Sequence, residues 1–185
     1  RNMKRHEYLR MFSLLFFSVQ LSVLEPAFAN PSDESIKVGV ILPLTGSAAS
    51  WGDPMRKAAE MAAEDLTPQI RSQISLIFED DQLNASLGIN AFKKLTSMDQ
   101  IAAGIVFGGQ SVAAIAPVSE QLKIPIFAIT ANHNLVSNKT YSFRHWIDSN
   151  EQVRVLVPEL VSRKRHRIAI AVVTHEAMLD YVAKF

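Results

Sequence analysis

Short apolar runs follow one another from residue 36 onward, separated by stretches in which polar and apolar residues are mixed. The runs are rich in Val, Ile and Phe and do not alternate strictly with polar residues, which is typical of strands buried on both faces of a sheet. They predict five strands, at Ile36–Leu42, Ile74–Phe78, Ala103–Phe107, Ile124–Ile129 and Ile168–Val173.

Helices are predicted between these strands, because apolar residues recur there every three or four positions. They lie near Pro54–Leu66, Ala85–Leu95, Val112–Leu122 and Glu151–Ser162. In the first of them, Asp53 is the predicted N-cap and Pro54 the first helical residue. Pro158 lies inside the fourth and predicts a kink or a break there.

The alternation of strand and helix predicts an α/β fold, a doubly wound parallel sheet with helices flanking both faces. In such sheets a ligand binds beyond the carboxyl ends of the strands. The loops to search for chemistry are therefore 43–53, 79–84, 108–111 and 130–140.

A long polar stretch, residues 132–152, separates the fourth strand from a new helix and strand. It predicts a domain boundary, with a first domain at 30–147 and the beginning of a second at 148–185. The second domain is incomplete at Phe185, so the chain is expected to be a fragment.

The first 29 residues have the pattern of a secretory signal peptide. A basic start is followed by the apolar run 11–24 and by an A-x-A cleavage site that ends at Ala29. We expect cleavage after Ala29 and export to the periplasm. An uncleaved N-terminal anchor is the alternative.

Charge and cysteine content narrow the class of protein. The chain has 19 basic and 18 acidic residues, and without residues 1–29 it has 15 and 16, a net charge of −1. A near-neutral protein lacks the basic footprint of a nucleic-acid binder. Because there are no cysteines, an exported fold must rest on its core without disulfides.

The segment Gly108–Ser111 joins a predicted buried strand to a helix. Its two glycines allow a ligand to approach the backbone, and the free amides and dipole of a helix start favour an anion. Ser111 is either a ligand-binding hydroxyl or a plain helix cap. Residues 109–113 also read G-x-S-x-A, close to the nucleophile elbow of α/β-hydrolases, so a secreted serine hydrolase using Ser111 is an alternative.

Two other loops carry candidate binding residues. Trp51 stands among small and hydroxyl residues, with no apolar neighbour in its loop to bury it, and is a candidate wall of a ligand cleft. Thr130 and Asn132 follow the fourth strand and would bring a hydroxyl and an amide near Ser111 if the strands are neighbours. An ordinary turn is the alternative for both.

The chain carries no convincing metal or cofactor motif. Asp80 and Asp81 are more typical of a turn and helix-cap pair than of a cation site. Residues 175–179 begin like a zinc-binding H-E-x-x-H helix, but Leu179 replaces the second histidine. We therefore expect no metal and no cofactor.

Taken together, the segments resemble the leucine/isoleucine/valine-binding type of periplasmic binding protein. The resemblance covers residues 36–173 and rests on the order and spacing of IKVGVILPLTGSAASWGDPMRKAAEMAAEDL, ISLIFEDDQ, GIVFGGQSVAAIAPVSEQLKIPIFAIT and SFRHW. It implies two doubly wound lobes that close on a ligand, with lobe I at 30–147 and the start of lobe II at 148–185.

The resemblance also implies a site and a role. The family's ligand-gripping serine falls on Ser111, its small loop after the fourth strand on Thr130 and Asn132, and its aromatic wall on Trp51. The implied function is capture of a small polar ligand, an amino acid, amide or related carboxylate, for delivery to a membrane ABC permease. The ligand-binding lobe of a sensory receptor is a further alternative, and neither reading is an enzyme.

Overall fold

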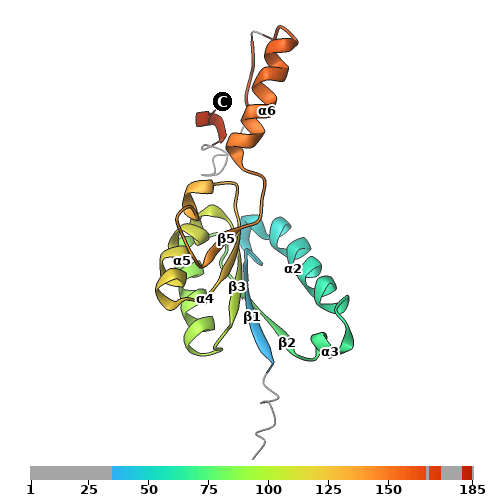
Figure 1. Cartoon of the computed structure of the whole chain (residues 1–185), viewed down its shortest axis with the longest axis vertical. Helices are drawn as coiled ribbons and strands as arrows, with labels where there is room; N and C mark the ends of the chain where they lie inside the picture. Colours follow the sequence, from blue (N-terminus) through green and yellow to red (C-terminus); the bar gives the residue numbers. More distant parts are fainter. Residues whose placement is uncertain (1–34, 166, 172–180, 185) are drawn as a thin grey trace, which may run out of the picture. The chain divides into compact units, whose positions relative to one another are not determined.

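The computed structural model describes residues 35–165, 167–171 and 181–184. These residues form a five-stranded sheet (Figure 1) in the order β2-β1-β3-β4-β5, and every neighbouring pair of strands is parallel. The strands are β1 (Ile36–Leu42), β2 (Ile74–Asp80), β3 (Ala103–Phe107), β4 (Ile126–Ile129) and β5 (Ser142–Arg144). The predicted doubly wound parallel sheet is confirmed.

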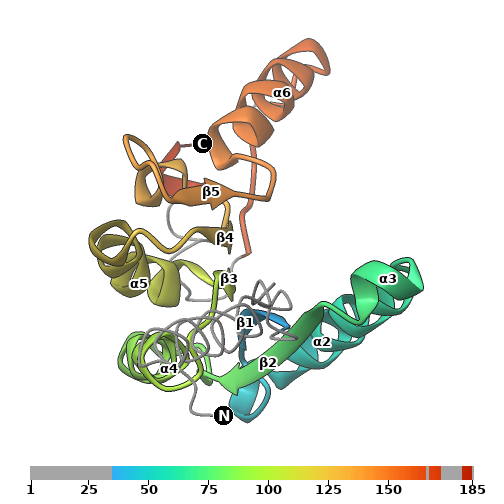
Figure 2. The ribbon, with the colours of Figure 1, turned by 60° about the horizontal axis from the view of Figure 1, so that its bottom comes forward.

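Helices lie on both faces of the sheet. Figures 1 and 2 show α4 (Ala85–Ser97) and α5 (Gly109–Leu122) on one face, with α2 (Ala49–Glu64) and α3 (Pro68–Arg71) on the other. Further along the chain lies α6 (Ser149–Ser162), residues 181–184 are also helical, and 3-10 turns occur at Gly46–Ala48 and His133–Leu135.

The main core lies between the sheet and the α4/α5 face. Its fully buried side chains come from α4, α5 and the inward positions of three central strands, and include Ile41, Phe92, Leu95, Val106, Ile115 and Ile126. Burial of apolar surface contributes about 25 cal/mol per Å², so the burial of this cluster is the main favourable contribution to the folding free energy of the domain.

The strand predictions are accurate for β1 and β3, while β2 runs two residues further than expected and β4 begins two residues later. The expected strand Ile168–Val173 is not confirmed. Residues 168–171 have no regular structure, and residues 172 and 173 lie outside the described part of the chain.

The predicted start of the first helix is wrong. The helix α2 begins at Ala49, its N-cap is Ala48 without a side-chain bond, and Pro54 lies inside it. As the sixth residue of the helix, Pro54 lacks the amide that would otherwise donate to the carbonyl of Ser50. Asp53 instead forms an exposed ion pair with Lys57, at 2.7 Å.

The early start brings α2 against the end of β1. At Gly52 a Cβ atom would lie 2.1 Å from the carbonyl oxygen of Pro43, so only glycine permits this close approach. Trp51 therefore belongs to the first turn of α2 rather than to an open loop.

The polar stretch 132–152 is not simply a linker. It contains β5, which extends the sheet by pairing in parallel with β4, and a 3-10 turn at His133–Leu135. Pro158 does not split α6, which is assigned as one helix over Ser149–Ser162.

The predicted signal peptide, residues 1–29, lies outside the described residues. Within the part of the chain that is described, no helix has the length and apolar character needed to cross a membrane.

We expect Gly52→Ala to destabilise the domain by about 2 kcal/mol. The overpacking against Pro43 outweighs the better helix propensity of alanine. Urea denaturation measures the change, with Ser50→Ala in the same turn as a control that should stay within about 0.5 kcal/mol of wild type. Equal stability of both variants would show that the backbone at Gly52 gives way easily.

Candidate functional site

The strand order reverses between β1 and β3. From β1 the chain crosses to β2 on one side, and then returns to β3 on the other side of β1. In doubly wound sheets, this reversal separates the loops at the carboxyl ends of the two strands, and ligands bind between those loops. Here the loops are those that follow Leu42 and Phe107.

Trp51 and Phe107 face each other at this point. Their ring centroids are 6.3 Å apart with an interplanar angle of 20°. Trp51 comes from the first turn of α2 and remains 59% exposed, whereas Phe107 is partly buried at the end of β3. The apolar neighbour that the loop sequence does not provide therefore comes from the adjacent strand.

Asp80 anchors the loop after β1. Its Oδ1 accepts hydrogen bonds from the amides of Leu44 (2.8 Å), Thr45 (3.2 Å) and Gln82 (3.0 Å), and its Oδ2 accepts one from the Thr45 hydroxyl. Burial opposes ionisation, but these four donors outweigh it and lower the pKa of Asp80. One carboxylate thus ties the end of β2 to the loop after β1.

Ser111 lies inside the domain rather than at its surface. It is the third residue of α5, whose N-cap is Gly108, so the hydroxyl is not the cap. The side chain is fully buried, and its Oγ donates to Oδ2 of Asp81. It also packs closely on α4, since a Cβ at Gly88 would lie 2.7 Å from Oγ. In this arrangement the hydroxyl is engaged by Asp81, and the whole residue is buried.

The Asp81 carboxylate is itself fully buried. Besides the Ser111 hydroxyl it accepts a hydrogen bond from the amide of Leu83, at 3.0 Å. Burial raises the pKa of Asp81, against the opposing effect of these two donors. The predicted turn role of the acidic pair is confirmed by the bonds to Gln82 and Leu83, but the cap of α4 is Asn84.

The hydrolase alternative finds no support in this geometry. A nucleophilic serine needs an exposed hydroxyl next to a general base. Ser111 is buried, and the side-chain hydrogen bond that its hydroxyl makes among the described residues goes to a carboxylate, not to a histidine.

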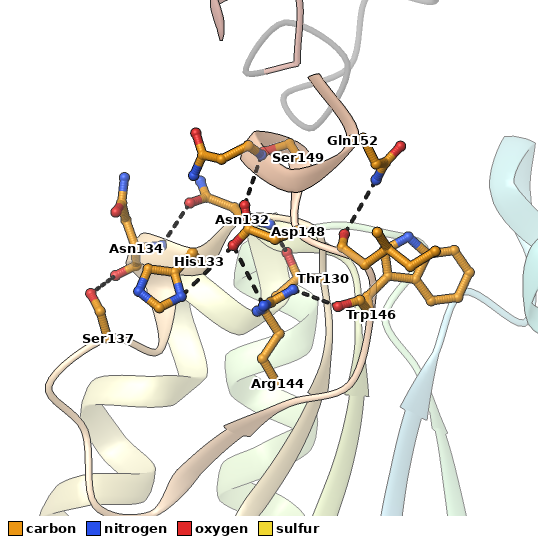
Figure 3. A network of polar contacts seen from close by, with 12 residues as sticks. Thr130, Asn132, His133, Asn134, Ser137, Arg144, Trp146, Asp148, Ser149 and Gln152 are labelled. Carbon is orange, nitrogen blue, oxygen red and sulfur yellow. Dashed lines mark hydrogen bonds and ion pairs between the residues drawn. The ribbon is translucent and has the colours of Figure 1, made fainter. Parts of the chain in front are cut away.

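Thr130 and Asn132 make local turns after β4 (Figure 3). The Thr130 hydroxyl accepts from the Asn132 amide at 3.2 Å, and the Asn132 side chain accepts from the Asn134 amide at 3.0 Å. The strands β3 and β4 are neighbours, as the prediction required. Among the described residues, however, no hydrogen bond joins either side chain to Ser111.

A charged cluster next to this loop was not predicted. Asp148 caps α6 by accepting from the Asn150 amide at 2.7 Å, and its Oδ2 lies 3.4 Å from Arg144 Nη2 and 3.8 Å from His133 Nδ1 (Figure 3). Arg144 also donates to the carbonyl oxygen of Trp146. The only signal in the sequence was the position of Asp148 directly before a helical pattern. Its partners Arg144 and His133 come from two preceding segments, so no local pattern connects the three residues.

An apolar hollow lies elsewhere, along α6. Its lining combines apolar side chains with two glutamates: Ile147, Glu151, Gln152, Val155, Leu156, Glu159 and Tyr181. The glutamates would repel an anion, so the candidate site stays at the strand ends. No group of three or more His, Asp or Glu side chains suited to a metal ion occurs among the described residues.

The fold is an α/β domain of the doubly wound class. A family model described as periplasmic binding protein matches residues 35–185. The chain therefore belongs to the periplasmic binding protein family, and its curated relatives are of the Leu/Ile/Val-binding type. These relatives are substrate-binding proteins rather than enzymes.

Three comparisons illustrate the relationship. A Leu/Ile/Val-binding protein homologue from Brucella melitensis is 30% identical over 118 residues, which cover 62% of this chain and 30% of that protein. A leucine-binding protein from Thermotoga maritima has a TM-score of 0.70 and 20% identity, covering 81% of this chain and 45% of its own. A solute-binding protein from Rhodopseudomonas palustris, solved with 3,4-dihydroxybenzoic acid, has a TM-score of 0.71 and 20% identity, covering 82% and 42%. The chain thus spans less than half the length of each.

We expect Asp80→Asn and Asp81→Asn to change the pH dependence of stability in opposite directions. The lowered pKa of Asp80 means that its carboxylate stabilises the fold above the unfolded pKa of about 3.9, and that this is lost as pH falls through the folded pKa. The raised pKa of Asp81 means that the fold loses stability as pH rises from about 3.9 to the folded pKa.

Urea denaturation between pH 3 and pH 7 measures both effects. The free energy of unfolding of wild type minus that of Asp80→Asn should increase as the pH rises. The corresponding difference for Asp81→Asn should decrease as the pH rises. Slopes of the same sign would contradict the opposite environments assigned to the two carboxyl groups.

Proposed function

We propose that this protein is an exported binding protein that captures a small ligand with an anionic end and delivers it to an ABC permease. The observation that carries this proposal is the exposed Trp51, stacked on Phe107 where the strand order reverses between β1 and β3, in a chain of the periplasmic binding protein family. The ligand would be an amino acid, an amide or a related carboxylate.

The anionic end would lie at the start of α5. The first-turn amides have no intrahelical acceptors and carry the positive end of the helix dipole. Neither 43–53 nor 108–111 contains Lys or Arg, so neutral donors must hold the charge. The amides at the start of α5 together with Thr130 and Asn132 are the proposed polar contacts, and Trp51 is the proposed wall.

The compared structures support a carboxylate ligand. One is named as a leucine-binding protein and another was solved with 3,4-dihydroxybenzoic acid. Both compounds combine one carboxyl group with an apolar body, which suits an arrangement of helix-start amides beside an indole.

We expect Trp51→Ala to weaken binding about ten- to a hundredfold, because the ligand loses apolar cover. Calorimetric titration with a panel of amino acids, amides and carboxylates measures the change. Asp53→Ala is the control. It removes only an exposed ion pair, so it should alter stability by less than about 0.5 kcal/mol and leave affinity unchanged. A panel without any binder would refute the proposed function.

We expect Ser111→Ala to lower stability by about 1–3 kcal/mol, because it leaves the buried Asp81 carboxylate without one donor. Affinity should stay within about threefold of wild type, since the hydroxyl is engaged by Asp81 and the amides at the start of α5 are all retained. Denaturation and titration of the same preparation separate the two effects. A tenfold loss of affinity at unchanged stability would show that the hydroxyl leaves Asp81 to grip the ligand.

We expect the exported protein to begin at Asn30, as cleavage after Ala29 requires. Cell fractionation followed by mass spectrometry of the intact protein tests this. A periplasmic protein that retains residues 11–24 would instead favour an uncleaved anchor.

A further inference from the structure

The positive charge of this chain is concentrated at the end of α6. Residues 163–167, here called the basic turn, read RKRHR, and residues 160–175 contain no Asp or Glu. Without residues 1–29 the chain has 15 basic and 16 acidic residues, so the four Arg and Lys of the basic turn leave 11 basic against 16 acidic. A short, strongly positive segment thus belongs to a chain that is otherwise negative, with a net charge of −5.

The backbone of the basic turn has a defined geometry. Arg163 is the C-cap of α6, and Lys164 follows in the left-handed conformation, with φ of 53°. The Lys164 amide donates to the Val161 carbonyl at 2.9 Å, and the Arg165 amide donates to the Leu160 carbonyl at 3.0 Å. This pair of bonds is a Schellman motif, in which glycine is the usual left-handed residue. The helix end by itself therefore does not require a lysine at this position.

Three cations of the basic turn lie beyond the helix and have no acidic partner in the described part of the chain. Arg163 pairs with Glu159 at 2.6 Å and complements the negative end of the helix dipole, an effect that is confined to the last turn. Lys164, Arg165 and Arg167 are exposed, and no ion pair joins them to a described carboxylate. Their mutual repulsion would be relieved by an anionic surface.

We propose that the basic turn is a docking site for the surface of a membrane that contains anionic lipids. A planar charged surface needs no matching shape, because it attracts each Lys or Arg near it separately. A stable protein–protein interface buries about 1,200–2,000 Å², which is more than five residues supply. The hollow along α6 is lined by other residues, so it offers no pocket for a small anion in the basic turn.

This inference goes beyond the proposed function and does not depend on the ligand. The negative remainder of the chain is repelled by anionic lipid, so the protein would approach the membrane with the basic turn first. An exported binding protein held near the membrane in this way would search for its permease along a surface rather than through the whole compartment.

The expected strength of docking follows from the number of unpaired cations. Each Lys or Arg near an anionic membrane contributes about fivefold to the binding constant, so three contribute about a hundredfold. The attraction acts over about one Debye length, which is about 8 Å in physiological salt and about 3 Å at 1 M salt. Docking should therefore be lost when the salt concentration is raised.

Co-sedimentation with vesicles tests the proposal, using protein recovered from the periplasm. Wild type should bind vesicles that contain about one third phosphatidylglycerol and should not bind vesicles of phosphatidylcholine alone, at about 0.05 M salt. The triple variant Lys164→Gln/Arg165→Gln/Arg167→Gln should bind the anionic vesicles about a hundredfold more weakly. Since all variants share one N-terminus, its contribution cancels. Equal binding by wild type and the triple variant would overturn the proposal.

A second triple variant separates the basic turn from net charge. Arg71→Gln/Lys93→Gln/Lys123→Gln removes the same charge from three exposed positions that are widely spaced in the sequence. It should bind anionic vesicles within about threefold of wild type, because isolated cations do not approach the surface together. A loss as large as that of the first triple variant would refute a local docking site.

The single variant Lys164→Gly distinguishes docking from a structural role. Glycine favours the left-handed conformation, so stability to urea should not fall. Vesicle binding should nevertheless weaken about fivefold, a result that a purely structural lysine would not produce. Lower stability with unchanged vesicle binding would show that this lysine serves the helix end and would contradict its docking role.

Other partners give different results in the same assay. If wild type fails to bind anionic vesicles, the proposal is overturned and an acidic protein face becomes the partner to test. If duplex DNA competes the protein off the vesicles at equal phosphate concentration, the proposal is likewise overturned in favour of a nucleic acid. Ligand titration of the first triple variant should match wild type, so a failure of docking leaves the proposed function intact.

Discussion

The parallel pairing of β1 with β2 on one side and β3 on the other is the constraint on which the site depends. It requires the chain to reverse direction across the sheet, and in doubly wound sheets the loops after the two strands at such a reversal are the place where ligands bind. It also places α2 and α4 on opposite faces. Trp51 and Phe107, 56 residues apart in the chain, meet only because their strands are neighbours.

Two adjacent carboxyl groups support this edge in different ways. Asp80 lies where several amides converge, so its charge is stabilised and holds the loop after β1. Asp81 points into the interior toward α5, where burial dominates and a serine hydroxyl is its partner. Neighbouring residues of one type thus experience opposite electrostatic environments, because successive side chains at a strand end point to opposite sides of the sheet.

The structure also changes the chemical roles expected for the candidate binding residues. The hydroxyl of Ser111 is occupied by Asp81, which leaves the helix-start backbone as the polar part of the site nearest to Phe107. Thr130 and Asn132 shape their own turn and sit beside the Arg144–Asp148–His133 cluster at the start of α6.

The sequence by itself determined the fold class, the family and most of the elements. Apolar runs and helical spacing depend on burial along one element, so β1, β3 and the central helices could be read from periodicity. Local signals were misleading where a distant contact competed with them. Asp53 and Pro54 look like a helix start, but the approach of Gly52 to Pro43 lets α2 begin at Ala49. Likewise Ser111 looks like a free cap, but Asp81, thirty residues earlier, binds its hydroxyl. Only the tertiary structure could decide these points, because side-chain direction and partner depend on which strands become neighbours, and that information is not contained in any short stretch of sequence.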